Sequence, residues 1–283
     1  MDNPHPGQTV FPKINSALVA GIFKHRDPLS HKGDHGHALL IAGSKGKMGA
    51  AVIAARACCR SGAGLTSIFI PEAERAVLQQ AIPEAMLLFR KPREGYKPYA
   101  SVGIGPGIGT SKAAQQLLKD LLESYDRPVL LDADALNILS KKQSWLKKIP
   151  AGSVITPHPK EFDRLFGDVE NADVRRQKAL QLSLQYPFVI VLKDHQTLVA
   201  FKGKGWLNTT GNAGLAKGGS GDMLSGIITA LLAEKYLPED AARLGVFLHG
   251  LAADLCLQQQ SPETMLATDV IEYLPGAFRL LDK

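Results

Sequence analysis

The sequence predicts an α/β fold in which a mostly parallel central sheet carries helices on both faces. Short apolar runs alternate with helix-like segments along most of the 283 residues. Each run is a near-continuous string of apolar residues, which is typical of strands buried on both faces of a parallel sheet. No internal repeat and no low-complexity linker interrupts this alternation.

The domain organisation follows from length and composition. A chain of this length holds one large α/β domain or two small ones. No shift in composition marks a boundary, so a single domain is the simplest interpretation. We expect residues 1–30 to form an N-terminal extension with a short helix over 14–23, and residues 31–283 to form the one domain.

The strands are predicted from short apolar runs that end in turn residues. The first run, Ala-Leu-Leu-Ile-Ala, leads into Gly43 and Ser44. A small hairpin is expected after the last run of the sheet. The predicted strands cover residues 38–42, 65–70, 100–104, 129–131, 153–155 and 188–192, and the hairpin covers 197–201 and 205–207.

The helices are predicted from helical spacing of apolar residues and from start signals. One helix is expected to begin at Pro159, because proline suits the first helical position and Glu161 complements the helix dipole. Two helices are expected to close the chain ahead of a short tail. Besides the helix at Pro159, the predicted helices cover residues 49–60, 72–80, 111–124, 221–233 and 241–258.

The charge balance favours small anionic ligands. The formal net charge is +6, from 33 Lys and Arg against 27 Asp and Glu, and the sequence pI is about 9.1. The cations are spread along the chain, and a mildly positive surface suits anionic small molecules. There is no basic tract and only 6% of the residues are aromatic, so a nucleic-acid partner has little support.

Cysteine usage and the N-terminus indicate the compartment. Cys58, Cys59 and Cys256 form no CxxC pair, and adjacent cysteines do not readily bridge each other. We interpret them as buried free thiols, which fits a reducing compartment. Residues 1–10 contain no signal-peptide apolar region, and no run is long enough to span a bilayer. We expect a cytoplasmic protein without a membrane partner.

Glycines and polar side chains gather directly after the predicted strands. In open α/β sheets, ligands bind outside the carboxyl ends of the strands. Independent segments should therefore meet at one edge of the sheet, which is stronger support for a site than any single motif. These segments are residues 42–44, residues 105–109, Asp132, His158 and Lys193.

The glycine-rich stretch at 211–222 runs straight into an apolar helix pattern and is the strongest local motif. Glycines let the backbone approach a ligand closely, and a helix N-terminus offers free N–H groups and partial positive charge. The stretch predicts an anion hole made by Gly218, Gly219, Ser220 and Gly221, suited to a transferring phosphoryl group. Asp222 lies at its mouth, either as a functional acid or as an N-cap.

Two other glycine motifs fail their closest templates. Residues 43–48 lack the glycine spacing and the Ser or Thr of a P-loop, and residues 103–109 fit no dinucleotide fingerprint. The second motif is either a tight turn or a backbone surface that a ligand touches.

Asp132 and His158 each have two interpretations. Asp132 follows a strand and is either a turn residue or a carboxylate that orients Mg²⁺ through water, while Asp134 is better explained as a turn and cap residue. His158 stands between two prolines. It is either a helix-start spectator or a ligand contact.

A polar run follows the last predicted strand of the sheet. It is either a charged turn or a set of contacts to the ribose and phosphates of a nucleotide. Lys217 is either a phosphate counter-charge or a solvated lysine. The run consists of Lys193, Asp194, His195, Gln196 and Thr197.

Taken together, these segments resemble the ribokinase-like superfamily and, more narrowly, the ADP- or ATP-dependent (S)-NAD(P)H-hydrate dehydratases. The stretch at 211–224 carries the most specific resemblance, because Gly-x-Gly-Asp alone indicates only the superfamily. The remaining matching segments are residues 31–33, 40–44, 49–50, 62–64, 105–107, 131–136, 156–162 and 191–197.

The resemblance implies a repair reaction. Members phosphorylate the hydroxyl of the hydrated nicotinamide ring of NADHX or NADPHX, and elimination of phosphate restores NADH or NADPH. Asp222 would be the base that takes the hydroxyl proton, with ADP or ATP as donor and Mg²⁺ as cofactor. The runner-up is a kinase of the same superfamily acting on a vitamin precursor, and a non-catalytic nucleotide sensor is a further alternative.

The resemblance also implies where the ligands bind. Ala42, Gly107, His158 and Asp222 would contact the hydrated cofactor, and residues 193–197 with Gly221 would hold the nucleotide. The chain has no room for an epimerase domain before Ala38, so it resembles the free-standing enzymes, which favours ADP. A homotetramer and cooperation with a separate NAD(P)HX epimerase are the expected partnerships.

Overall fold

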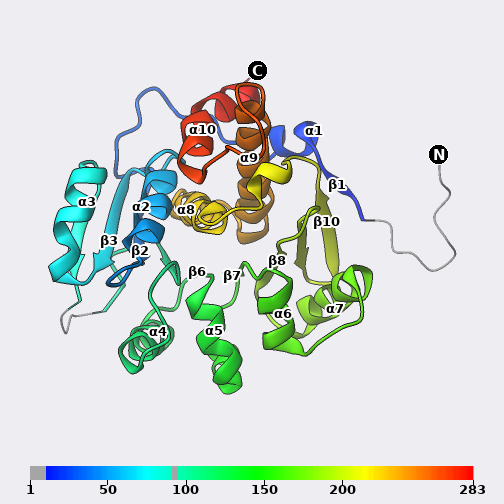
Figure 1. Ribbon diagram of the computed structural model, residues 1–283, viewed down its shortest axis with the longest axis horizontal. Coiled ribbons are helices and arrows are strands. Elements are labelled where there is room, and N and C mark those ends of the chain that lie inside the picture. Colours follow the sequence, from blue (N-terminus) through cyan, green and yellow to red (C-terminus); the bar gives the residue numbers. More distant parts are fainter. Residues whose placement is uncertain (1–10, 91–94, 283) are drawn as a thin grey trace, which may run out of the picture.

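The computed structural model describes residues 11–90 and 95–282, in which one ten-stranded sheet lies between two layers of helices (Figure 1). The strand order is β1-β10-β9-β8-β7-β6-β5-β2-β3-β4. All strands from β8 to β4 in this order pair in parallel, and β9 is antiparallel to both of its neighbours. The mostly parallel sheet predicted from the apolar runs is confirmed.

Every strand of the parallel part except β4 follows from a predicted apolar run. The strands are β1 (Lys13–Ile14), β2 (His37–Ile41), β3 (Leu65–Ile70), β4 (Met86–Phe89), β5 (Ser101–Ile104), β6 (Val129–Leu131), β7 (Val154–Ile155), β8 (Val189–Leu192), β9 (Leu198–Phe201) and β10 (Lys204–Asn208).

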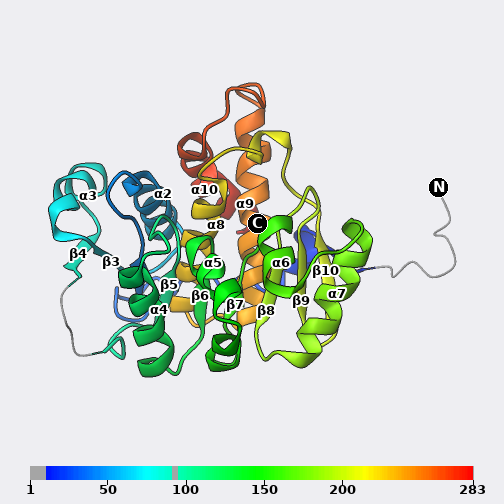
Figure 2. The same ribbon diagram turned by 60° about the horizontal axis from the view of Figure 1, so that its bottom comes forward.

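The helices cover both faces of the sheet (Figures 1 and 2). One layer contains α2 (Met48–Cys59), α8 (Ser220–Ala233), α9 (Pro238–Leu257) and α10 (Ala267–Leu281), and the other contains α4 (Lys112–Ser124), α5 (Asp134–Lys141), α6 (Pro159–Phe166) and α7 (Ala172–Gln185). The short helices α1 (Ser16–Ala20) and α3 (Arg75–Ala81) lie at the two ends of the sheet. None of the helices in the described part of the chain is both long enough and apolar enough to cross a membrane.

Both faces of the sheet are buried. In β2, Leu39 and Ile41 belong to the core under α4 and α5, whereas Ala38 and Leu40 belong to the core under α2 and α8. Successive side chains of a strand point to opposite faces, so a strand covered on both sides must be apolar at every position. This requirement explains why the strands are continuous apolar runs.

The structure corrects several predicted elements. The helix expected over 14–23 is limited to α1, because Ile14 pairs in β1 and Asn15 caps the helix by accepting from the Leu18 N–H at 3.0 Å. The short tail expected at the C-terminus contains α10. This helix was not predicted because proline, here Pro275, normally interrupts a helix. Three further elements were not predicted: β4, α5 and α7.

The N-terminal residues take part in the sheet. β1 pairs in parallel with β10, and Ile14 is 0% exposed within the core beneath α8 and α9. Among the cysteines, Cys58 and Cys256 are buried free thiols as expected, while Cys59 is partly buried. The division into residues 1–30 and 31–283 stays a prediction.

Candidate active site at the carboxyl ends of the strands

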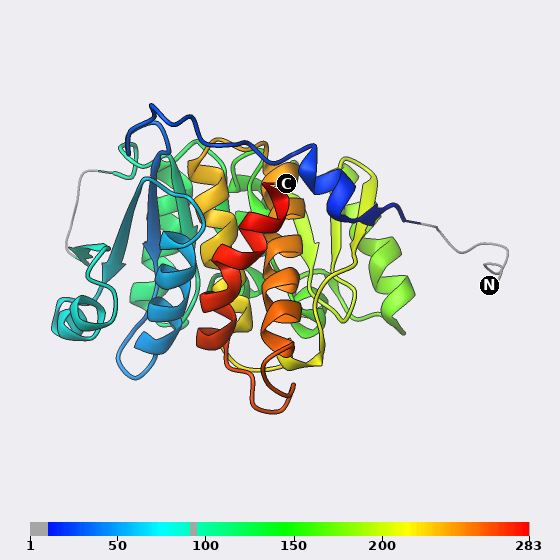
Figure 3. The same cartoon turned by 90° about the horizontal axis from the view of Figure 1, so that it is seen from above.

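The chain order reverses between β2 and β5, and in open α/β sheets ligands bind outside the carboxyl ends of the strands at such a switch point. The loops that follow these two strands are joined to each other. The Gly43 N–H donates to the Pro106 carbonyl at 2.8 Å, and the Ser44 hydroxyl donates to the Gly107 carbonyl at 2.7 Å. In Figure 3 this edge of the sheet lies at the bottom, where the loops after β2 and before α8 turn.

Ala42 and Gly107, the two backbone contacts predicted for the hydrated cofactor, lie in these joined loops. Ala42 is buried at the end of β2, and its carbonyl accepts from Arg90 at 2.9 Å. Gly107 has a φ of 65°, and a Cβ at this position would lie 2.7 Å from the Lys47 carbonyl oxygen. Only glycine fits there, because a side chain would collide with Lys47 and with Ala50 of α2.

Asp134 links a third loop to the same edge. It is the first residue of α5, and its carboxylate accepts from the Gly109 N–H at 2.8 Å and lies 3.6 Å from the Lys47 Nζ. The turn role predicted for Asp134 is therefore part of a larger one, since it connects α5 with the loops after β2 and β5.

The Ser220 N–H, predicted as part of the anion hole, donates to the Lys217 carbonyl at 3.4 Å, while its neighbours at the N-terminus of α8 keep their amides free. The N-cap of α8 is Gly219, with a φ of 94°, which has no side chain to accept from the first turn. Within residues 11–90 and 95–282, no hydrogen bond occupies the N–H groups of Gly218, Gly219, Gly221 or Asp222. Such amides, together with the helix dipole, form a binding site for an anion.

Asp222 is the third residue of α8 and not its N-cap, so the capping alternative is excluded. Across the described residues its carboxylate accepts no hydrogen bond. Burial raises the pKa of Asp222 to about 6, and the negative charges of Asp132 and Asp134 act in the same direction while Lys193 opposes them. A carboxylate with a pKa near neutral is suited to accept a proton during a reaction.

Lys193 lies between two acids next to Asp222. Its Nζ donates to Asp132 at 2.8 Å and lies 4.0 Å from the Glu161 carboxylate. Asp132, which is 1% exposed, also accepts from the Ser225 hydroxyl at 2.7 Å. The ammonium group stands close to Gly221, where an added Cβ would lie 3.2 Å from Nζ. The geometry thus places a cation beside the free amides of α8.

His158 caps α6 and faces the same cluster. Its Nδ1 accepts from the Glu161 N–H at 3.3 Å, and the Glu161 carboxylate accepts from the His158 N–H at 2.9 Å. Burial lowers the pKa of His158, and the charge of Lys193 lowers it further. Because Nδ1 is an acceptor, the neutral ring carries its proton on Nε2 and can donate it to a ligand.

The rest of the polar run after β8 forms a turn ahead of the hairpin. The Asp194 carboxylate accepts from the His195 N–H at 2.8 Å, and the Thr197 hydroxyl donates to the Asp194 carbonyl at 3.4 Å. Asp194, His195 and Gln196 are exposed and Thr197 is partly buried. Lys193 alone points into the acidic cluster, and the other members remain available to a ligand outside it.

The donor set does not fit a magnesium ion held by the protein. Both carboxylate oxygens of Asp132 are engaged, one by Lys193 and one by Ser225. The described part of the chain has no group of three or more His, Cys, Asp or Glu side chains able to hold a metal. Mg²⁺ keeps several waters and takes few ligands from the protein when phosphates supply the others, so the water-mediated role predicted for Asp132 stays a prediction.

A family model described as NAD(P)H-hydrate dehydratase matches residues 38–276. The chain belongs to this family. It is 37% identical over 273 residues to the ADP-dependent (S)-NAD(P)H-hydrate dehydratase of Bacillus subtilis, covering 92% of this chain and 95% of that protein. The resemblance noted in the sequence is confirmed.

Two further relatives show the extent of the match. A bifunctional NAD(P)H-hydrate repair enzyme of Vibrio cholerae is 37% identical over 267 residues, and the chain spans about half (53%) of its length. The crystal structure of the B. subtilis ADP/ATP-dependent NAD(P)H-hydrate dehydratase, co-crystallized with ATP/Mg²⁺, superposes with a TM-score of 0.83 at 35% identity. That likeness covers 96% of this chain and 99% of the other, so the ribokinase-like fold is confirmed.

Several residues of the candidate site escaped the sequence analysis. Glu161 was assigned only to a helix start, although it faces Lys193. Ser225 follows Asp222 by three positions, and this helical spacing was the available signal. Arg90 donates to the Ala42 and Gly43 carbonyls from beyond β4, and no local pattern indicates so distant a contact.

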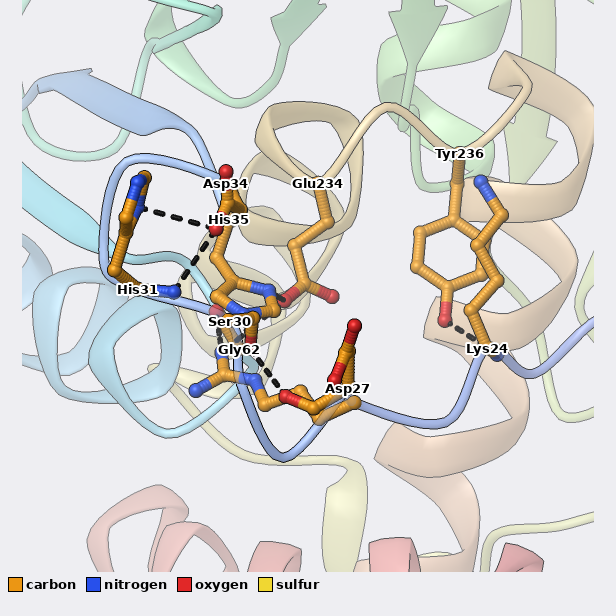
Figure 4. A network of polar contacts seen from close by, with 10 residues as sticks. Lys24, Asp27, Ser30, His31, Asp34, His35, Gly62, Glu234 and Tyr236 are labelled. Carbon is orange, nitrogen blue, oxygen red and sulfur yellow. Dashed lines mark hydrogen bonds and ion pairs between the residues drawn. The ribbon is translucent and has the colours of Figure 1, made fainter.

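A separate hollow of about 700 Å³ lies near the amino ends of β2 and β3, away from Asp222. The Glu234 carboxylate accepts from the Arg26 guanidinium at 3.2 Å and lies 3.3 Å from the His35 Nδ1. Figure 4 shows how Glu234 and His35 lie in this polar network. The Lys24 N–H donates to the Tyr236 hydroxyl at 2.9 Å. The C-terminal ends of α2, α8 and α10 meet here, and cations complement helix C-termini. The contacts of Lys24, Arg26 and His35 therefore hold the N-terminal segment against the helices.

Proposed function

We propose that this protein repairs nicotinamide cofactors: it removes water from the S-form of NADHX or NADPHX, using ADP as phosphoryl donor. The observation that carries the proposal is the set of free amides at the α8 N-terminus beside Asp222 and Lys193. The names of the relatives support the substrate and the donor.

In the proposed reaction Asp222 accepts the proton of the ring hydroxyl as its oxygen attacks the terminal phosphorus of ADP. The bond from this phosphorus to the bridging oxygen breaks, and AMP leaves. The phosphorylated hydrate then loses inorganic phosphate from one ring carbon and a proton to the solvent from the neighbouring ring carbon, which restores the ring double bond. The free amides around Gly219 and the Lys193 ammonium stabilise charge on the migrating group, where positioning and electrostatics carry most of the catalysis.

The ligands are assigned to two sides of this centre. The bare backbone at Ala42 and Gly107, together with the His158 Nε2–H, binds the hydrated cofactor. The nucleotide lies along residues 193–197 and Gly221. Magnesium would arrive with the nucleotide, whose phosphate oxygens supply its ligands. A homotetramer, a cytoplasmic location and cooperation with a separate epimerase remain part of the proposal.

The proposal is tested by incubating the protein with purified NADHX, ADP and Mg²⁺. We expect the absorbance of reduced nicotinamide to appear together with stoichiometric AMP and phosphate. A stable phosphorylated alcohol without recovery of NADH would instead support the kinase of a vitamin precursor. Binding of nucleotide without any turnover would support the nucleotide sensor.

A further inference from the structure

Helix α9 lies directly behind the glycine-rich loop that leads into α8 (Figures 1 and 3). The Asp254 carboxylate accepts from the Gly211 N–H at 2.9 Å and from the Asn212 side chain at 3.0 Å. The Thr210 hydroxyl donates to the Phe247 carbonyl at 2.8 Å. One rigid helix therefore fixes the beginning of the loop.

The same helix also reaches the end of the loop. His249 Nε2 lies 3.2 Å from the Ser220 hydroxyl, and Ser220 is the first residue of α8. The hydroxyl is not used as a cap, since the N-cap position belongs to Gly219. The His249–Ser220 contact thus joins α9 to the amides that form the proposed anion hole.

The protonation state of His249 follows from its surroundings. Burial lowers the pKa of His249 to about 4, and the charge of Lys193 lowers it as well. The ring is therefore neutral near pH 7, and one of its nitrogens carries a proton while the other is bare. The Ser220 backbone acts in the opposite direction and raises the pKa, as an acceptor of a ring N–H does.

The two tautomers have opposite consequences for a bound anion. If Nε2 is bare, the Ser220 hydroxyl must donate to it and turns only lone pairs toward an anion. If Nε2 carries the proton, the Ser220 oxygen accepts from His249, and its own hydrogen is free to be donated.

We infer that His249 is a positioning residue: its Nε2–H donates to the Ser220 hydroxyl, which then donates its hydrogen to an oxygen of the transferring phosphoryl group. This inference rests on the proposed function, and it adds a side-chain donor to the backbone amides. His249 itself touches neither substrate nor nucleotide and acts only through Ser220.

The test is a double-mutant cycle with S220A, H249L and the combined variant. Removing one donor from an anion hole costs about 10²-fold in kcat when the donor is a strong one. We expect S220A and H249L each to lower kcat by roughly ten- to a hundredfold with little change in KM for the hydrate. The combined variant should be no slower than S220A alone, and H249Q, which keeps a side-chain N–H donor, should recover most of the rate.

A second histidine–serine pair provides the matched control. His37 Nε2 lies 2.8 Å from the Ser67 hydroxyl at the far end of β2 and β3. H37L should change the melting temperature but leave kcat unaltered. Equal loss of kcat from H249L in the wild-type and the S220A backgrounds would overturn the inference, since His249 would then act by packing.

A spectroscopic readout separates this inference from the proposed function. The ¹⁵N chemical shifts of the His249 ring report which nitrogen carries the proton, whether or not the hydrate turns over. A protonated Nδ1 with a bare Nε2 would refute the inference while leaving the proposed function intact. If the wild-type protein fails to convert NADHX, the proposed function fails. The His249–Ser220 coupling is then tested by measuring the Kd for ADP of the wild type, S220A, H249L and the combined variant.

Discussion

Asp222 shows how a single carboxylate is prepared for proton transfer. It lies at a helix N-terminus, which favours its charged form, yet burial and two neighbouring acids raise its pKa to about 6. Lys193 opposes this rise, and Asp132 and Glu161 hold Lys193 in place. The proposed base is therefore ionised at neutral pH but still basic enough to accept a proton.

Replacing Asp222 by asparagine should separate activity from stability. We expect D222N to lower kcat by about 10²- to 10⁴-fold, the range for loss of general-base help. The folded-state pKa lies above the ordinary value of an aspartate side chain, so the stability falls as the pH rises from that ordinary value to about 6 and stays at the lower level above it. At pH 7.5 D222N should thus raise the free energy of unfolding by on the order of 1 kcal/mol, measured by urea denaturation.

The control for this variant is D168N, because Asp168 is exposed in the loop between α6 and α7. It should change neither kcat nor the urea midpoint. Retention of full turnover by D222N would rule out Asp222 as the base, even if the protein repaired the hydrate.

Lys193 should control the pH dependence of the reaction. For the wild type we expect kcat/KM to rise with pH and level off above about 6, as Asp222 ionises. Because Lys193 lowers this pKa, K193M should move the rising limb to higher pH. It should also weaken ADP binding more than hydrate binding. An unshifted limb, or equal losses for both ligands, would contradict these roles.

At the scale of elements, the start of α8 owes its shape to glycine. Gly219 has a φ of 94°, and a Cβ there would lie 2.7 Å from Ile53 Cδ1 and 3.1 Å from the Ala267 Cβ. The left-handed conformation turns the chain into α8 with the amides of Gly221 and Asp222 unpaired. A side chain at this position would conflict with both α2 and α10.

G219A should therefore disturb fold and activity together. We expect a loss of about 1–3 kcal/mol in the free energy of unfolding, the cost of a strained backbone position. The ADP affinity should fall as well, since the amides move. G49A is the matched substitution for stability, because a Cβ at Gly49 meets nothing within 4 Å and alanine favours the α2 helix. A G219A protein as stable as G49A would show that the turn tolerates a side chain.

At the scale of the whole molecule, the N-terminal segment adds an edge strand to the sheet and contacts the C-terminal end of α8. β1 extends the sheet beyond β10, and the segment that follows α1 runs along the upper edge of Figure 3 to reach β2. Arg26 and His35 of this segment hold Glu234 at the end of α8. Within the predicted extension, Ile14 thus pairs in the sheet and Arg26 contacts the end of α8.

A substitution at Ile14 tests how much these contacts contribute to the free energy of unfolding. It is 0% exposed, and Ile→Ala changes in a core typically cost about 2–5 kcal/mol. We expect I14A to lower the free energy of unfolding by this amount, measured by chemical denaturation. L29A is the control, since Leu29 is 92% exposed, and it should have little effect. Similar stability of I14A and the wild type would mean that β1 contributes little to the stability of the fold.

Local patterns were sufficient for the elements of the sheet centre. The strands at 65–70 and 129–131 were predicted with the bounds that the structure has, because a strand buried on both faces must be apolar throughout. Prediction failed at the edge strand β4, which is half-buried, and at α10, where Pro275 and Gly276 interrupt the helical pattern. At both places packing against neighbours overrode the local signal.

The sequence by itself determined the fold class, the family and the edge of the sheet where the candidate site lies, since apolar runs and the glycines after them are local properties. Only the tertiary structure decided that Lys193 meets Asp132 and Glu161, and that His249 lies behind Ser220. These contacts join residues far apart in the chain. Their existence depends on the order of the strands and on the packing of α9, which no local pattern encodes.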